Sequence, residues 1–228
     1  MTVLFSDGFE SGDFSAWTST SGTPSVQSII KHSGIYAALF SGSTDKYCQK
    51  TISEGDCYLR AYVYFDSLPS ASHYVSFFDT YDSIDDSLEV GVTIYNDSGT
   101  VKWGIRHAPY GTPPENLAST GPTAQIWYCV ELSVHRTDNT HVSYQLWVNG
   151  VSVISSSYVT SSSTHKVNSI YILGADKSES ISNYVDAVVV ADRRIYCEKP
   201  LFHILRGRGG DKRLGTTYHQ PYTRPPHY

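Results

Sequence analysis

Asp7-Gly-Phe-Glu-Ser-Gly-Asp-Phe-Ser-Ala-Trp17 is the stretch on which the fold prediction depends. It places three aromatic and three acidic side chains within eleven residues, with glycines where a chain can turn tightly. The aromatic rings can anchor this turn to a hydrophobic core, while the carboxylates of Asp7, Glu10 and Asp13 point elsewhere. The stretch therefore predicts an anchored acidic turn close to the first strand.

A turn that gathers carboxylates and backbone carbonyls suits a hard cation, because calcium takes six to eight oxygen ligands. Near the other end of the chain, Asn183-Tyr-Val-Asp186-Ala-Val-Val-Val190 carries one acid inside an apolar run. A buried strand carboxylate needs a charge partner or a metal. We therefore predict that Asp186 reaches back to Asp7 and Glu10 and joins the first and last strands through calcium. The alternative is that the turn acids are solvated and that Asp186 caps a neighbouring backbone.

Three further motifs follow the opening stretch in order, namely His32-Ser-Gly-Ile-Tyr-Ala-Ala38, Trp147-Val-Asn-Gly-Val151 and Tyr184-Val-Asp-Ala-Val-Val189. Together the four motifs resemble the concanavalin A-like jelly rolls of the laminin G and polysaccharide lyase type. Calcium-bearing carbohydrate-binding modules share much of this pattern. The resemblance implies a structural calcium held by Asp7 or Glu10, by backbone near Ser33 and by Asp186. Many relatives have a second acid where this chain has Ala187, so one possible ligand is missing.

The rest of the chain favours strands over helices. The whole chain of 228 residues includes 18 tyrosines and one methionine. No stretch of it repeats apolar residues with the period of a helix. Apolar alternation between turn residues predicts about a dozen strands, a pattern typical of a two-sheet sandwich. We predict a single all-β domain, an antiparallel jelly-roll β-sandwich over residues 1–198. No apolar run is long enough for a membrane-spanning helix.

Residues 199–228 differ in composition from this domain. They hold six basic residues against Asp211 alone, although the whole chain carries a net charge of −5. Such an asymmetry points to an appendage with its own partner. We predict a basic C-terminal arm that docks on a neighbouring subunit in a homo-oligomer or polymer. We expect no nucleic-acid partner, because no folded surface interleaves stacking platforms with these basic residues.

The four cysteines, Cys48, Cys57, Cys129 and Cys197, leave three disulfide pairings open, and free thiols are an alternative. Strand alternation places Cys57 toward the core and Cys129 on the opposite face, which makes that pair improbable. Met1 precedes the first strand with no leader sequence, as in a processed protein or a virion protein. We expect an extracellular, cell-surface or virion-surface protein.

Strand alternation also predicts an outward set of aromatic and charged side chains. If the strands share one sheet, its exposed face carries Arg60, Tyr62, Tyr64, Tyr95, Lys102, Arg106, Glu131, His135 and Trp147. Aromatic rings offer flat apolar platforms with polar tips, which match the faces of sugars. We predict a glycan site formed by Arg60, Tyr62, Tyr64, Tyr95, Arg106, His135 and Trp147. The alternative is that this face packs on another subunit.

A glycosidase requires two carboxylates about 5–10 Å apart on one face, and the outward glutamates Glu89 and Glu131 lie on different strands. A uronate lyase would need a Tyr or His base with Arg and Lys neighbours. The residues with the right chemistry are Arg60, Tyr62, Lys102, Arg106 and His135. The usual lyase strand signatures are absent, so we expect a protein that is not an enzyme. The prediction is a non-catalytic recognition or adhesion module that binds glycan. Alternatives are a structural subunit of a filament, virion or surface layer, and a polysaccharide lyase.

Overall fold

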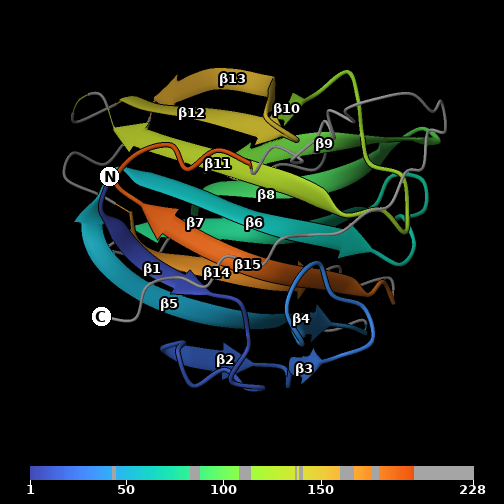
Figure 1. Ribbon diagram of the computed structural model, residues 1–228. Helices are drawn as coiled ribbons and strands as arrows, with labels where there is room; N and C mark the ends of the chain where they lie inside the picture. The colour runs from blue at the N-terminus through green and yellow to red at the C-terminus, as the bar shows by residue number, and fades with distance from the viewer. Residues whose placement is uncertain are drawn as a thin grey trace, which may run out of the picture. The chain divides into compact units, whose positions relative to one another are not determined.

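A computed structural model describes residues 1–42, 45–82, 88–107, 114–136, 138, 141–159, 167–175 and 180–197. The predicted fold class is confirmed, because these residues form two antiparallel sheets stacked as a sandwich (Figure 1). The predicted basic arm, residues 199–228, lies outside the described residues. No helix in the described part of the chain is long and apolar enough to cross a membrane.

One sheet has eight strands. Its order is β13 (Val151–Val159), β12 (His141–Val148), β11 (Tyr128–Arg136), β6 (Cys57–Phe65), β15 (Asn183–Ala191), β4 (Ala37–Phe40) and β3 (Ser25–Gln27), with β1 (Val3–Asp7) paired to β15. The first and last strands are therefore neighbours through direct pairing, with Asp7 opposite Val188.

The other sheet has seven strands. Its order is β10 (Asn116–Leu117), β9 (Thr100–His107), β8 (Leu88–Asp97), β7 (Tyr74–Asp82), β14 (Val167–Ala175), β5 (Lys46–Gly55) and β2 (Ser19–Ser21). Each sheet thus combines a run of consecutive strands, β11–β13 in one and β7–β10 in the other, with strands from distant parts of the sequence.

The inner faces of the two sheets form one core. Phe65 of β6 packs edge-on against Phe77 of β7, with ring centroids 5.5 Å apart, and Trp103 of β9 joins them. At the start of the chain, Phe9 is fully buried and stacks on Trp17. The predicted anchoring of the opening turn by its aromatic rings is confirmed.

Strand β8 departs from the predicted alternation. We expected Glu89 to face outward, which by alternation would turn its neighbour Leu88 toward the core. The pairing of β7 with β8, however, shifts register between Thr80 and Tyr81. This bulge turns both side chains over, because an extra residue reverses the faces that follow it. Glu89 accepts a hydrogen bond of 2.8 Å from Arg136 of the opposite sheet, and Leu88 lies on the outer face.

The expectation of one shared face is also wrong. Strands β6, β11 and β12 belong to the eight-stranded sheet, whereas β8 and β9 belong to the seven-stranded sheet. Alternation assigned the predicted glycan residues to outward faces correctly, but a period of two says nothing about which sheet a strand joins. Tyr95 and Arg106 are consequently separated from the other predicted site residues by the core.

Candidate functional site

The predicted calcium ligands Glu10 and Asp186 approach the same short segment. Asp186 Oδ2 accepts hydrogen bonds from the backbone N–H groups of His32 and Ser33, at 3.0 and 2.9 Å. Glu10 Oε1 accepts one from the N–H of Ile35 at 3.0 Å. Burial raises the pKa of Asp186 to about 6, against the lowering effect of these N–H groups, and the charge of Glu10 raises it further. This is the capping arrangement expected as the alternative to calcium.

Asp7 is engaged separately. Its carboxylate accepts hydrogen bonds from the N–H of Phe9 and from Nε1 of Trp17, both at 2.7 Å, and burial raises its pKa. Across the described residues, no group of three or more His, Cys, Asp or Glu side chains is placed to hold a metal ion. The carboxylates of Asp7, Glu10 and Asp186 thus accept hydrogen bonds from N–H donors, an arrangement that fits a metal ion poorly. Calcium binding stays a prediction.

On the eight-stranded sheet, Tyr62 is buried beneath another ring rather than exposed. His32 stacks on Tyr62 with ring centroids 3.6 Å apart, and Arg60 is buried beside it. Burial, followed by the charge of Arg60, lowers the pKa of His32 to about 4, so this imidazole is neutral at pH 7. Tyr64 is half-buried beside the ring of Trp127. The loop that follows β3 therefore covers part of the predicted glycan platform.

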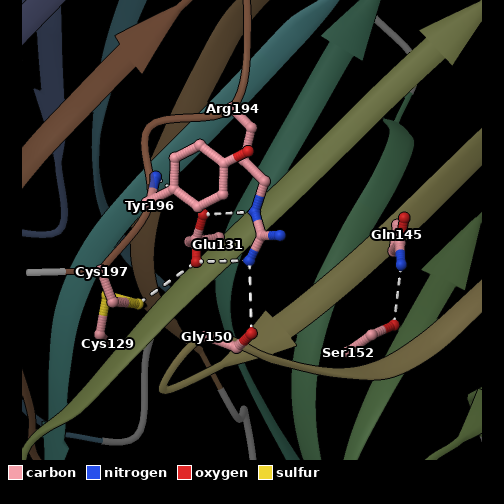
Figure 2. A network of polar contacts seen from close by, with 8 residues as sticks. All are labelled: Cys129, Glu131, Gln145, Gly150, Ser152, Arg194, Tyr196 and Cys197. Atoms are coloured by element: carbon pink, nitrogen blue, oxygen red, sulfur yellow. Dashed lines mark hydrogen bonds and ion pairs between the residues drawn. A yellow bond between two sulfur atoms is a disulfide. The ribbon is translucent and has the colours of Figure 1, made fainter. Parts of the chain in front are cut away.

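Trp147 is covered as well, by the segment that follows β15. Arg194 lies over the indole, 4.1 Å from the ring centroid. It also forms two hydrogen bonds with Glu131, at 3.0 and 3.1 Å (Figure 2). A disulfide between Cys129 and Cys197 fixes the end of this segment to β11. The segment 192–197 thus holds Trp147 and Glu131 against the sheet. It leaves little of Trp147 to contact a sugar.

The disulfide settles the cysteine alternatives. Cys48 and Cys57 are free and buried, and Cys129 pairs with Cys197 rather than with Cys57. The prediction that Cys57 and Cys129 face opposite ways is confirmed.

The outer face of the seven-stranded sheet has a different character, because its central side chains are polar and buried. Arg106 of β9 reaches across β8 to β7, where Nη1 donates a hydrogen bond of 3.0 Å to the hydroxyl of Tyr74. Its Nη2 lies 4.0 Å from Oδ2 of Asp79, and the guanidinium lies 4.8 Å from the centre of the Tyr74 ring. A cation, a phenol and a carboxyl group therefore meet on one face.

Four polar atoms at this place have no hydrogen-bond partner. They are Oγ of Ser76, Oδ1 of Asp79, Oγ1 of Thr93 and Nε of Arg106, half of the eight such buried atoms in the described part of the chain. Buried polar groups normally find partners, and leaving one without a partner costs about 1–3 kcal/mol. Such a concentration requires a physical explanation, and a catalytic role or a bound water or ion is one. We call Tyr74, Ser76, Asp79, Thr93 and Arg106 the β7–β9 site.

Two glycines in the strands make room for the site. A Cβ on Gly91 would collide with Oδ1 of Asp79, and one on Gly104 would lie 2.8 Å from Oγ1 of Thr93. Glycine inside a strand often marks close approach by another group. This signal is visible in the sequence. With the acid Asp79 directly after Phe77 and Phe78, it could have led to the residues that our sequence analysis missed, which are Tyr74, Ser76, Asp79 and Thr93.

Asp79 carries the largest electrostatic perturbation of the site. Burial raises its pKa to about 7, while Arg106 opposes the rise and Asp45 adds to it. The carboxyl group is therefore mostly protonated below neutral pH. The site then presents the charge of Arg106 without an equal opposing charge, which suits an anionic ligand.

Comparisons with known proteins identify fold relatives only. No family model matches the chain, and no curated protein matches it. Among solved structures, a cellulose-induced protein superimposes with a TM-score of 0.62 at 17% identity, covering 85% of this chain and 100% of its own. An endo-β-1,4-glucuronan lyase from the fungus Trichoderma reesei gives 0.56 at 14% identity, covering 83% and 95%. An alginate lyase gives 0.59 at 16% identity, covering 87% and 95%.

These matches correct the expectation that the protein is not an enzyme. Several of the similar structures are polysaccharide lyases, and each of the two described above superimposes over more than four-fifths of this chain. The absence of lyase strand signatures misled that prediction, because the architecture persists at identities where short signatures do not. The implied jelly-roll architecture agrees with these neighbours.

Proposed function

We propose that this chain binds a uronate-containing polysaccharide at the β7–β9 site and cleaves it by β-elimination. The observation that carries the proposal is the set of buried polar atoms without partners around Arg106. A uronate carboxylate would give the guanidinium the bidentate partner that it lacks, because Arg presents donors matched to a carboxylate.

The elimination needs a cation and a group that moves a proton. A base removes the proton from C5, next to the carboxylate, and the electron pair forms a double bond between C4 and C5. The bond from C4 to the glycosidic oxygen breaks, and that oxygen takes up a proton. Arg106 stabilises the charge that develops on the carboxylate. The hydroxyl of Tyr74, which accepts the hydrogen bond from Arg106, is the proton-transfer group closest to that cation.

Asp79 contributes in its neutral form. A protonated carboxyl group can donate a hydrogen bond to the substrate carboxylate, whereas an ionised one would repel it. Because the pKa of Asp79 is about 7, we expect uronate binding to weaken as the pH rises above neutrality. The charge state of Asp79 thus sets the upper pH limit of the reaction.

The fold relatives support this assignment by analogy. The glucuronan lyase and the alginate lyase act, by their names, on polymers of uronates. The Cys129–Cys197 disulfide favours an oxidising compartment, such as the outside of a cell, where such polymers occur. An extracellular location is part of the proposal.

The test is an ultraviolet assay for new unsaturated uronate ends, with the full chain and glucuronan, alginate or polygalacturonate. We expect activity on at least one polymer. Arg106→Ala should lower kcat/KM by at least a hundredfold, and Tyr74→Phe should lower kcat with a smaller effect on KM.

The matched control is Lys102→Ala. Lys102 is a second outward cation on β9, but it is paired with Asp97 at 2.7 Å. Its removal should leave activity within about twofold of the wild type. Absence of unsaturated ends with all three polymers, or full activity in Arg106→Ala, would refute elimination at this site.

A further inference from the structure

The outer face of the eight-stranded sheet has a hollow at the end away from Tyr62. It encloses about 330 Å³ and is lined by ten residues of β6, β11, β12, β13 and the adjoining turns: Asp56, Tyr58, Ser133, His135, Ser143, Tyr144, Gln145, Ser155, Ser156 and Asp192. Small-molecule sites usually measure about 300–1,000 Å³, so the hollow is large enough for a sugar.

Strand register explains why the sheet is hollow here. One row of paired residues crosses four strands as Tyr58, Ser133, Gln145 and Ser155. Three steps between strands span about 14 Å, which is room for more than one sugar ring. The row therefore has an aromatic ring at one end and short polar side chains along the rest.

The neighbouring rows form the walls. On one side, Arg194 covers Glu131 and Trp147, as described above. On the other side, Nδ1 of His135 lies 2.5 Å from Oδ2 of Asp56, and both side chains are nearly half exposed. The pairing with Asp56 orients the His135 ring and leaves Nε2 as the nitrogen available to a ligand. The hollow is thus bounded by two fixed groups and floored by hydroxyl and amide groups.

The charge of the hollow decides what it can bind. Asp56 and Asp192 contribute carboxylates, and no Lys or Arg is among the described residues that line it. The cations nearest to these carboxylates are already paired with them, His135 with Asp56 and Arg193 with Asp192, so a uronate would find no unpaired cation among the described residues here. A neutral sugar instead offers hydroxyl donors to the carboxylates and to Gln145, and its apolar face matches the ring of Tyr58.

We propose that this hollow is a second carbohydrate site, specific for neutral sugars and separate from the β7–β9 site. It goes beyond the proposed function, since it stands on other residues, on the other sheet and on the opposite charge preference. Such a site would hold the protein on a neutral polymer while the seven-stranded sheet faces an acidic one.

The test is isothermal titration of the full chain with cellohexaose and with mannohexaose, and with an oligoglucuronate as the acidic comparison. We expect one of the neutral hexasaccharides to bind. Tyr58→Ala should raise its Kd by at least tenfold. Gln145→Ala, which changes a partly exposed side chain, should raise it by at least threefold if Tyr58→Ala does not fold.

Two controls separate this site from the rest of the molecule. Tyr184→Ala removes another outward tyrosine of the same sheet, next to Tyr64, and should leave the Kd within about twofold. Arg106→Ala should also leave neutral binding unchanged, even if it abolishes cleavage of acidic polymers. The proposal is overturned if neither neutral hexasaccharide binds, if Gln145→Ala binds as the wild type does, or if Arg106→Ala removes neutral binding.

Discussion

Asp79 shows how one residue can link stability to ligand recognition. Its carboxyl group is 4% exposed and its Oδ1 has no hydrogen-bond partner among the described residues. The nearest cationic group is Nη2 of Arg106, at 4.0 Å, which is too far for a hydrogen bond. The fold therefore tolerates this acid mainly in its neutral form, and a ligand that fills the gap would relieve the cost.

We predict that Asp79→Asn changes the pH dependence of stability. Between pH 3.8 and about 7, the folded chain retains a proton on Asp79 that the unfolded chain has released, so stability falls as the pH rises through this window. Three pKa units correspond to roughly 4 kcal/mol as an upper bound. The variant should match the wild type near pH 4 and exceed it above pH 7, measured by urea unfolding across the pH series.

Asp186 provides the internal comparison. Its pKa of about 6 also lowers stability between pH 3.8 and about 6, and this part should persist in Asp79→Asn. Identical pH profiles for the variant and the wild type would contradict a raised pKa at Asp79.

At the scale of elements, the segment 192–197 supplies the donors to a buried charge: Glu131 accepts hydrogen bonds from Arg194, its one cationic partner among the described residues, and from the backbone N–H of Tyr196. The side chain of Glu131 is 3% exposed and receives two hydrogen bonds from Arg194 (Figure 2). Removing one member of a buried ion pair leaves the other charge buried without its partner, which costs about 3–5 kcal/mol. This pair, more than the cation–π contact, should decide how firmly the segment lies on β11 and β12.

We therefore predict that Arg194→Ala lowers the free energy of unfolding by about 3 kcal/mol or more and makes Trp147 accessible to acrylamide quenching. The control is Arg193→Ala. Arg193 is 67% exposed and contacts Asp192 at 3.4 Å, so its loss should cost at most about 0.5 kcal/mol. Equal effects of the two variants would show that Glu131 finds another partner or becomes hydrated.

The backbone at His32, Ser33 and Ile35, which Glu10 and Asp186 both contact, allows the calcium prediction to be tested. If calcium joins these carboxylates, about 100 Kd of the ion should add roughly 2.7 kcal/mol to stability, and a chelator should lower the Tm. Asp186→Ala should abolish that chelator effect. An unchanged Tm with chelator would assign the stability of this turn to the N–H groups of His32, Ser33 and Ile35 alone.

How well the sequence predicts the inner and outer faces of a strand depends on whether its side chains keep a strict period of two. Alternation placed the inner and outer residues of β6, β9, β11 and β12 correctly, because burial of one face fixes a period of two. It failed at Leu88 and Glu89, since a bulge is set by the pairing of β8 with β7 and leaves no local mark. The coverage of Tyr62 by His32 and of Trp147 by Arg194 depends on long-range contacts, which alternation does not report.

For the whole molecule, the two outer faces are separated by the core. The disulfide and the segment 192–197 lie on the eight-stranded sheet, whereas Arg106, Asp79 and Tyr74 lie on the seven-stranded sheet. Energetic coupling between distant sites needs an element with two discrete arrangements that both sites bias. Changes on one face should therefore alter the global stability without altering the chemistry of the other.

The disulfide tests this independence. Cys129 and Cys197 are 68 residues apart, and a loop of that length gives roughly 4 kcal/mol by the chain-entropy model. We predict that the double variant Cys129→Ser/Cys197→Ser loses stability of this order in urea unfolding. Below its Tm it should retain the kcat/KM of the wild type on acidic polysaccharide, because neither cysteine contacts the β7–β9 site. A folded double variant with at least tenfold lower kcat/KM would instead show that the position of the segment 192–197 is communicated through the core to Arg106.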